Sequence, residues 1–434
     1  MRIRRLAGAM ALATLTASVT LLVSPSPAQA AERIVLPVVS HWQTLADTDH
    51  VYVSSPGDNA VVATDHNGQV IKVVDGLDGA RGMSLTADDS TLYVALPEAD
   101  AIAEIDTTTL TEVRRFPTGT DTEPESLALA GGRLYFSYQA TLFNGGIGSI
   151  SIADAEPVVG LDDNAVWYSK PRLASSPAAP DRLVAVDSDG PDMRVYDVGT
   201  GTAQEIAYTT GVGAAEDLAI TPDGRSAITA VGSTYYHQQW RLSDLAEEAQ
   251  YDTGPYPNSV AIAPNGTVAA GVSAGSSDVY IYRLGETTPF RTIALAPGGS
   301  QELVPRGVAW APDGSKLFGT RFTYAGEVIL DIINDVHVAS SNITLTAPAS
   351  QPLGETVTVH GKLTSLLPFP RSTFVTVKRN SEQIATVKVK ANGTFTFTFT
   401  DSPLLAGWPI YTVDYAGDAS HTSAQATAQV EVTD

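Results

Sequence analysis

The 434-residue sequence contains no cysteine, and it has only 26 Lys and Arg residues against 48 Asp and Glu. The absence of cysteine excludes a disulfide framework and a lipid attached to an N-terminal cysteine, so stability must come from packing. A formal net charge of -22 repels phosphate backbones and anionic headgroups, which proteins usually engage through clustered Lys and Arg. We therefore expect no nucleic-acid partner.

Long apolar runs are also scarce, because no stretch after the first thirty residues approaches the roughly 18 residues of a membrane span. Residues 1–30 combine a basic "MRIRR", an apolar run from Leu6 to Val23 and the small-residue site Ala28-Gln29-Ala30, which predicts a secretory signal peptide. The Arg4-Arg5 pair leaves a twin-arginine route open beside the general secretory route. We expect a mature chain that is secreted, extracellular or loosely associated with the cell surface.

Sustained helical periodicity is missing as well, so the sequence predicts an all-β chain. One turn recurs instead, in "LAITPDGRSAIT" from Leu218, "VAIAPNGTVAAG" from Val260 and "VAWAPDGSKLFG" from Val308. Equivalent positions follow one another at roughly 40 to 50 residues, the period of a four-stranded propeller blade. They are Asp47, Asp88, Gly131, Asp181, Asp223, Asn265 and Asp313.

Seven such units predict a seven-bladed β-propeller over residues 31–334. The second unit reads as four strands, "GMSLT", "TLYVAL", "AIAEID" and "LTEVRRF". The last unit supplies three clear strands, while "RIVLPVV" stands before the first unit without a place in it. We expect this N-terminal strand to complete the last blade, which would leave no open sheet edge in the ring.

Two units carry a family likeness. The segments Thr91–Gly119 and His50–Val74 resemble the YVTN-type β-propeller repeats of bacterial secreted and surface-layer-like proteins, with a Tyr-Val pair opening the second strand. The other five units keep the turn and lose this signature. The resemblance implies propeller architecture and no single function, because the family is functionally mixed.

The sequence pattern changes after Asn334. From there apolar and polar residues alternate over short predicted strands, most plainly in "TFTFTFT" from Thr394. We expect a linker over residues 335–342 and a β-sandwich over residues 343–434. The spacing of "GETVTVHGKL", "NGTFTFTF" and "YTVDYAGDASHTSA" is similar to that of a bacterial Ig-like domain. That resemblance implies a spacer or surface tether.

One position just before each innermost strand should encircle a mouth of the central channel. These positions are His41, Arg81, Glu125, Arg172, Glu216, Asn258 and Arg306. Charged groups enclosed there must pair with one another, hold water or meet a ligand. The alternation of Arg and Glu favours neighbour pairing, and the alternative is an acid and base pair or a divalent-ion site of the kind found in lactonase-like propellers.

The loops entering each blade, and those joining its second and third strands, share one face and collect aromatic residues and amides. These residues are Tyr138, Phe143, Asn144, Trp167, Tyr168, Tyr235, Tyr236, Gln238, Gln239, Trp240, Phe322 and Tyr324. Exposed aromatic rings beside amides suit a sugar or a protein partner. Of this set, Trp167, Tyr235, Tyr236 and Trp240 are the predicted ligand contacts, unless they merely pack between blades.

Other motifs give weaker signals. "GVSAG" from Gly271 matches a nucleophile elbow, but it falls at the end of a strand rather than at a strand-to-helix turn. "DSDGPD" from Asp187 is either a turn between strands or a partial calcium loop. The seven histidines show no metal-ligand spacing, so we predict no metal and no cofactor.

Together these features favour a non-catalytic binding or scaffold protein that uses one propeller face for a cell-wall polysaccharide or a protein partner. A lactonase-like or lyase-like propeller enzyme with its site at the channel mouth is the alternative. A purely structural envelope component needs only the tandem modules and also stays open.

Overall fold

A computed structural model describes residues 32–141, 144–152, 157–158, 166–275, 277–295, 301–334, 336–400, 408–418 and 420–433. The described chain is all-β apart from two 3-10 turns, η1 (Pro56–Asp58) and η2 (Pro97–Ala99), as the sequence predicts. It holds no helix long and apolar enough to cross a membrane. The predicted signal peptide lies outside the described residues. The chain divides into two compact units, with the boundary after His337.

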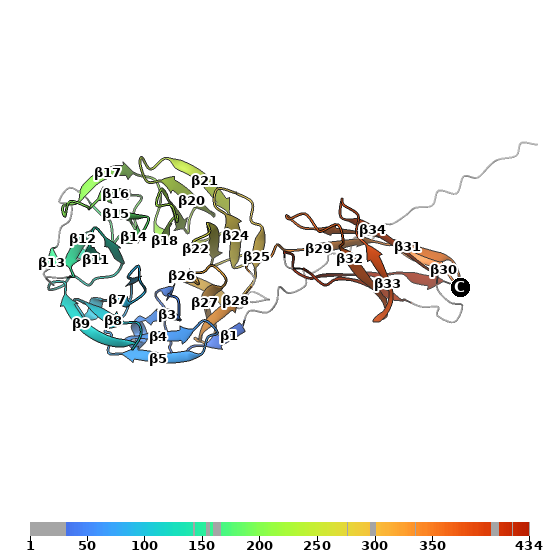
Figure 1. Cartoon of the computed structure of the whole chain (residues 1–434), viewed down its shortest axis with the longest axis horizontal. Helices are drawn as coiled ribbons and strands as arrows, with labels where there is room; N and C mark the ends of the chain where they lie inside the picture. Colours follow the sequence, from blue (N-terminus) through green and yellow to red (C-terminus); the bar gives the residue numbers. More distant parts are fainter. Residues whose placement is uncertain are drawn as a thin grey trace, which may run out of the picture. The chain divides into compact units, whose positions relative to one another are not determined.

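Six four-stranded sheets of the first unit take their strands in chain order. Their strands are β2 (Thr44–Ala46), β3 (His50–Ser55), β4 (Ala60–Asp65) and β5 (Val70–Asp75); β6 (Met83–Leu85), β7 (Thr91–Leu96), β8 (Ala101–Asp106) and β9 (Thr111–Pro117); β10 (Leu127–Ala130), β11 (Arg133–Thr141), β12 (Asn144–Ser151) and β13 (Pro157–Val158); β14 (Arg172–Ser176), β15 (Ala179–Val186), β16 (Met193–Asp197) and β17 (Gln204–Thr209); β18 (Ala215–Ile220), β19 (Ser226–Val231), β20 (Tyr236–Arg241) and β21 (Glu247–Asp252); β22 (Pro257–Ile262), β23 (Thr267–Val272), β24 (Val279–Arg283) and β25 (Arg291–Ile293). Figure 1 shows the sheets in a ring, with β14, β18 and β22 toward its middle and β5, β9 and β21 at its rim.

The seventh sheet joins both ends of the first unit. It contains β26 (Gln301–Trp310), β27 (Leu317–Thr323), β28 (Val328–Ile333) and the N-terminal β1 (Glu32–Val35). β1 pairs antiparallel with β28, from Glu32 opposite Ile332 to Val35 opposite Ile329. Arg33 of β1 also lies 3.4 Å from a carboxylate oxygen of the buried Asp331 on β28. The N-terminal strand therefore contributes hydrogen bonds and a charge contact to a sheet otherwise built from residues 301–333.

The recurring sequence is a tight turn between the first and second strands of a sheet. Between β18 and β19 the Gly224 amide donates to the Thr221 carbonyl (2.8 Å), and the Asp223 carboxylate accepts from the Arg225 amide (3.1 Å). Gly224 has φ of +70°, a left-handed conformation that glycine adopts without penalty. "APNG" at Ala263 and "APDG" at Ala311 close in the same way, with Gly amide to Ala carbonyl distances of 2.8 Å. The repeat thus encodes a structural turn.

The core of the ring lies between successive sheets. One cluster combines Val184 and Val195 of the fourth sheet with Ala227 and Trp240 of the fifth. Two of the second strands, β19 and β23, are buried along their whole length, because both of their faces pack against a neighbouring sheet. Tryptophan and valine side chains therefore hold neighbouring blades together.

A buried histidine should make the protein sensitive to acid. His237 on β20 is fully buried, and its Nε2 donates to the Ser259 carbonyl (3.0 Å). Burial lowers the pKa of His237 to about 4, although the bond to Ser259 partly raises it. Because the unfolded histidine takes up a proton below pH 6.5 and the folded one does not, stability falls as the pH drops from 6.5 to 4. We expect a loss of about 3 kcal/mol from this group.

The measurement is urea unfolding from pH 8 to pH 4, with His237→Gln as the comparison, since glutamine can still donate to Ser259. The difference in unfolding free energy between the two proteins should shrink in this window. A constant difference would show that His237 is not the acid-sensitive group.

The second unit contains two facing sheets around one core. Its strands are β29 (Asn342–Thr346), β30 (Ser350–Pro352), β31 (Thr356–Thr364), β32 (Phe374–Arg379), β33 (Glu382–Lys388), β34 (Thr394–Thr400), β35 (Ile410–Tyr415), β36 (Ala424–Gln429) and β37 (Glu431–Thr433). The sheets β29-β31-β34 and β33-β32-β35-β36 share a cluster that includes Val359, Phe395 and Val413. Part of the predicted linker belongs to the two units themselves. Val336 packs in the core of the first unit, and Ala339 forms a β-bridge with His421 of the second.

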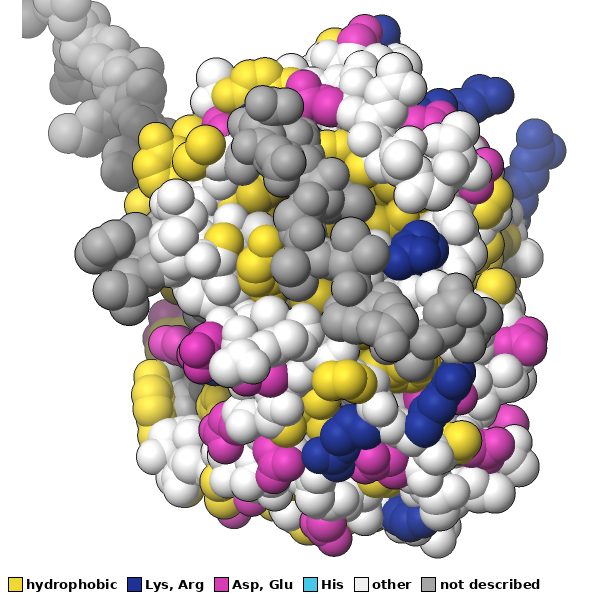
Figure 2. Space-filling model, turned by 90° about the vertical axis from the view of Figure 1, so that its left-hand side faces the viewer, with side chains coloured by type: hydrophobic (Ala, Val, Ile, Leu, Met, Phe, Trp, Pro, Cys, Tyr) yellow, Lys and Arg dark blue, Asp and Glu magenta, His cyan; other side chains and the backbone are white. Residues whose placement is uncertain are grey.

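The outer side of the ring carries a mixed surface. Figure 2 shows acidic side chains interspersed with Lys and Arg there. Arg114 of β9 pairs with Glu104 of the neighbouring β8, and Arg115 pairs with Glu112 on the same strand, β9. Such partly exposed pairs contribute little to stability.

Candidate functional site

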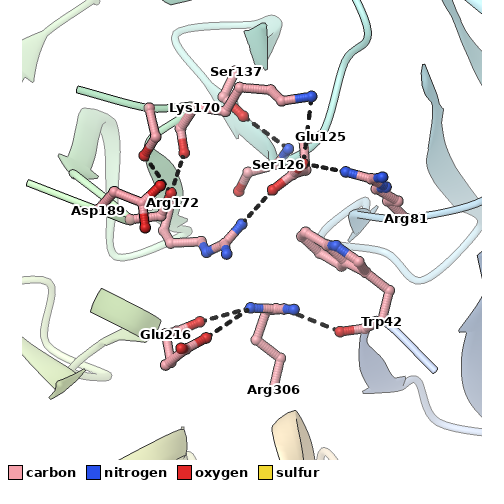
Figure 3. Close-up of polar contacts among 12 residues, drawn as sticks. Trp42, Arg81, Glu125, Ser126, Ser137, Lys170, Arg172, Asp189, Glu216 and Arg306 are labelled. Carbon is pink, nitrogen blue, oxygen red and sulfur yellow. Dashed lines mark hydrogen bonds and ion pairs between the residues drawn. The ribbon is translucent and has the colours of Figure 1, made fainter. Parts of the chain in front are cut away.

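Three of the predicted mouth positions meet around one carboxylate. Glu125, just before β10, accepts hydrogen bonds from Arg81, which precedes β6, and from Arg172 at the start of β14; the Arg172 Nη1 to Oε1 distance is 2.7 Å. The ammonium group of Lys170 lies 3.5 Å from the other Glu125 oxygen. Figure 3 shows these three cations converging on Glu125 from the second and fourth sheets. The predicted pairing of Arg81, Glu125 and Arg172 is therefore present.

The charge of Glu125 is fixed by this arrangement. Burial raises the pKa of Glu125, but the positive charges of Arg172, Lys170 and Arg81 outweigh it and bring the pKa down to about 2. Glu125 is therefore ionised near neutral pH, where it cannot donate a proton.

Glycine next to Arg81 allows the second and third sheets to approach closely. The Gly82 amide donates to the Glu125 carbonyl (2.9 Å), and a Cβ on Gly82 would lie 2.1 Å from that oxygen. We expect Gly82→Ala to push Glu125 away from Arg81 and to lower the unfolding midpoint by several degrees, because backbone cannot yield as a side chain can. Gly232→Ala is the matched control, because Gly232 is not among the positive-φ glycines and its nearest contact for a Cβ is the Pro257 carbonyl at 3.9 Å, an ordinary van der Waals distance. Equal midpoints for the two variants would contradict this close contact.

Glu216 and Arg306 form a second group at the mouth. Arg306 donates from Nη1 to the Glu216 carbonyl (2.8 Å) and from Nε to the Trp42 carbonyl (3.0 Å), while the Glu216 carboxylate lies 3.9 Å away. Its guanidinium carbon also lies 4.0 Å from the centroid of the Trp42 ring. Glu216 therefore pairs with Arg306, and the alternation predicted from sequence does not continue from Arg172 to Glu216.

The two remaining mouth positions, Asn258 and His41, bond to groups outside the charged clusters. Asn258 donates from Nδ2 to the Leu303 carbonyl (2.7 Å), and its buried Oδ1 has no hydrogen-bond partner among the described residues. His41 bonds through Nε2 to the Thr44 hydroxyl (2.9 Å). Burial, aided by the nearby charge of Arg306, lowers the pKa of His41 to about 3, so this ring is neutral at physiological pH.

Sequence reasoning missed Trp42 and Lys170. Trp42 directly follows His41, and its ring contacts the guanidinium groups of both Arg306 and Arg172, the latter at 5.4 Å. Lys170 stands two residues before Arg172 and also reaches Glu123 (3.2 Å). Both residues lie within two positions of a predicted mouth residue in the sequence. Whether their side chains point into the mouth, however, depends on the conformation of the loop that enters the sheet, which the sequence pattern does not give.

A cavity of about 350 Å³ continues from the mouth along the channel. Arg306 and Asp217 line it together with mostly apolar residues of β2, β18, β22 and β26. Asp217 accepts hydrogen bonds from the Val260 amide (2.8 Å) and the Leu218 amide (2.9 Å). Burial nevertheless raises the pKa of Asp217 to about 6. The channel therefore has a charged upper end and an apolar wall.

Two of the four predicted aromatic contacts are wrong. Trp167 is 1% exposed, and it packs with Tyr135 and Tyr196 between the third and fourth sheets. Trp240 is 7% exposed, lies at the far end of β20 from the β19–β20 loop, and donates to the Thr229 hydroxyl (3.0 Å). Both rings fill space between blades, where a large apolar surface is most stabilising.

Two of the three neighbouring amides, Gln238 and Gln239, are also wrong, whereas Asn144 at the start of β12 is exposed as predicted. Gln238 and Gln239 are buried along β20, and Gln239 donates to Glu248 (2.9 Å). Tyr236 is half-buried at the start of the same strand. Phe143, another member of the predicted aromatic set, lies outside the described residues.

Exposed tyrosines nevertheless gather on the predicted face. Tyr168 and Tyr256 lie in loops that enter the fourth and sixth sheets, whereas Tyr235 and Tyr324 lie between second and third strands. Because successive strands are antiparallel, all four loops are at the same end of their sheets. The exposed fractions run from 49% to 80%. The face opposite the recurring turn thus presents accessible aromatic rings from four successive sheets.

Tyr235 and Tyr256 form the best-defined aromatic pair. Their ring centroids are 5.6 Å apart in an edge-to-face arrangement, and both residues have φ of +63°. Non-glycine residues seldom adopt this conformation, and here the carbonyls of both accept backbone hydrogen bonds, from Gly254 and Ser273. Such strained positions often occur at functional sites.

The "DSDGPD" segment forms the turn between β15 and β16. Asp187 is buried and accepts from the Tyr168 amide (2.6 Å) and the Ser169 hydroxyl (2.9 Å). It therefore fixes the loop that carries Tyr168. Over the described parts of the chain, no group of three or more His, Cys, Asp or Glu side chains is arranged to hold a metal ion.

Comparisons with known proteins place the fold. No protein-family model matches the chain, and no curated protein matches it. Among solved structures it is similar to hydrazine synthase of Kuenenia stuttgartiensis, with 16% identity and a TM-score of 0.53, covering 69% of this chain and 97% of that one. It is also similar to the Cps50 (Swd1) β-propeller domain of Myceliophteria thermophila, with 14% identity and a TM-score of 0.55, covering 71% of this chain and 100% of that one.

A third similar structure is a chain of the Mitotic Checkpoint Complex, with 14% identity and a TM-score of 0.55, covering 76% of this chain and 99% of that one. At these identities the likeness shows fold and not function. The chain therefore contains a β-propeller.

Proposed function

We propose that this protein is exported and is a non-catalytic binding protein, built as a closed seven-bladed propeller followed by an Ig-like spacer. Its working surface is the face carrying the loops that enter each sheet and the loops between second and third strands. The observation that carries this proposal is the presence there of four exposed tyrosines: Tyr168, Tyr235, Tyr256 and Tyr324.

A protein partner suits this face better than a single sugar. The tyrosines belong to four successive sheets, so they define a broad surface, and the arginine cluster of the mouth adjoins the same loops. Tyrosine and arginine dominate the binding energy of protein interfaces. One structural neighbour is a chain of a multiprotein complex, which is consistent with a propeller used as a scaffold.

The mouth carboxylates suit charge pairing rather than catalysis. Glu125 is engaged by three cations, and its pKa of about 2 removes it as a general acid near neutral pH. We expect a panel of lactones and esters to show no turnover attributable to Glu125 or Glu216. If turnover were found and Glu216→Gln abolished it without disturbing the fold, the protein would be an enzyme rather than a binding protein.

The test of the binding face is capture of a partner by the immobilised mature chain from a bacterial cell-envelope extract. Tyr235→Ala combined with Tyr256→Ala should weaken capture more than tenfold, because interface tyrosines often contribute 2 kcal/mol or more each. The matched control is Phe374→Ala with Trp408→Ala, two exposed aromatics of the second unit. Equal capture by both double variants would contradict the proposal, and selective binding to a glycan array would assign the face to a glycan.

A further inference from the structure

The mouth holds two arginines, Arg172 and Arg306, and among the described residues no single carboxylate forms an ion pair with both. Arg172 bonds to Glu125, whereas Arg306 contacts Glu216 and two backbone carbonyls. In Figure 3 the guanidinium groups of Arg172 and Arg306 face the same space, with the Trp42 ring beside them. Within a chain of net charge -22, this is an unusual local arrangement of like charges.

Arg172 also has a hydrogen-bond donor to spare. Its Nε is buried and has no partner among the described residues. Its neighbour Glu125 already serves Arg81 and Lys170. Buried donors are nearly always satisfied in folded proteins, so an unpaired one points to a missing acceptor.

The charge of Arg172 acts on its neighbour Arg306. Burial, and next the positive charge of Arg172, lowers the pKa of Arg306 to about 10. The closest carboxylates offset the lowering of the Arg306 pKa only in part. Asp217 is held by backbone amides of β18 and β22, and the side chain of Glu216 is 47% exposed and 3.9 Å from Arg306.

We propose that the space between Arg172 and Arg306, beside Trp42, receives a carboxylate group from an acidic side chain of the partner. This assignment rests on the proposed binding function and names the chemistry of its central contact. A guanidinium fork matches the two oxygens of a carboxylate. A monoanion fits better than a phosphate dianion, because Glu125, which bonds to Arg172, and Asp217, which lines the cavity together with Arg306, repel each added negative charge.

Trp42 completes the site. Its ring stacks against Arg306 at 4.0 Å and stands 5.4 Å from Arg172, so it orients both guanidinium groups. Held in this way, the arginines lose little freedom when the carboxylate binds, which favours affinity for a small group.

The experiment measures binding of a blocked Gly-Glu-Gly peptide to the mature chain by calorimetry, with Gly-Gln-Gly and inorganic phosphate as comparison probes. The glutamate peptide should bind at least tenfold more tightly than the glutamine peptide. Arg172→Gln should remove that preference, while Arg172→Lys should retain part of it. The matched control is Arg283→Gln, an exposed arginine paired with Glu286 at the opposite end of its sheet.

Arg172→Gln should fold, because Glu125 keeps Arg81 and Lys170 as partners, and circular dichroism checks this. Equal affinity for both peptides, a preference that survives in Arg172→Gln, or tighter binding of phosphate than of the glutamate peptide would each overturn the proposal. The tyrosine double variant should bind the peptide normally. If the tyrosine double variant loses partner capture but still binds the peptide, the tyrosine face and the carboxylate site act independently. If Arg172→Gln loses peptide binding while partner capture is unchanged, the proposed function stands and the carboxylate site does not contribute to it.

Discussion

Removal of residues 32–38 is expected to lower the midpoint of thermal unfolding by about 10 °C or more and to promote aggregation. The deletion takes away β1 and exposes the edge of β28, which is then free to pair with another chain. It also removes Leu36 and Val38, which are 3% and 5% exposed. Each such side chain stabilises the fold by roughly 1.5–3 kcal/mol, and in a unit of this size 1 kcal/mol changes the midpoint by about 2–4 °C.

Calorimetry of the chain beginning at residue 31, with and without residues 32–38, makes this comparison. Arg33→Gln is the control, since it keeps the strand and removes only the partly exposed contact with Asp331. A deletion variant that melts like its parent would rule out closure of the ring by the N-terminal strand.

Asp331→Ala should destabilise the protein by about 3–5 kcal/mol, because it leaves a buried arginine without its partner. Arg321 on β27 and Asp331 on β28 are both fully buried and paired, with 3.2 Å between Arg321 Nη2 and Asp331 Oδ1. Burial raises the pKa of Asp331 despite this partner. The pair thus lies in the sheet that the N-terminal strand completes.

Replacing both residues, Arg321→Met with Asp331→Leu, should cost much less than Asp331→Ala alone, since a well-packed apolar pair often substitutes for a buried ion pair. Urea unfolding of the three proteins provides the comparison. If the double variant were as unstable as Asp331→Ala, the loss would reflect packing rather than an unpaired charge.

Local sequence was sufficient to predict the strands. "TLYVAL" and "AIAEID" coincide with β7 and β8, because alternation and turn residues act within one hairpin. The recurring turn was equally predictable, since its hydrogen bonds join residues two to five positions apart. The mouth residues followed from the same register, which placed Arg81, Glu125 and Arg172 at equivalent points of successive sheets.

Contacts between sheets were not predictable in the same way. Trp167 and Trp240 look like loop and strand-end aromatics in the sequence, and whether such a ring faces solvent depends on the neighbouring sheet. Trp42 is brought to Arg306 across 264 positions of sequence. The pairing of Glu216 with Arg306 joins residues 90 positions apart, so alternation along the chain could not reveal it.

The most direct test of the binding face is photo-crosslinking in the cell-envelope extract, with a benzophenone amino acid placed at Tyr168 or at Arg225. Both positions are exposed, the first among the entering loops and the second on the recurring turn at the opposite end of its sheet. A crosslinked partner from position 168 and none from position 225 is the expected result. Crosslinking from position 225 alone would place the working surface on the other face and contradict the account.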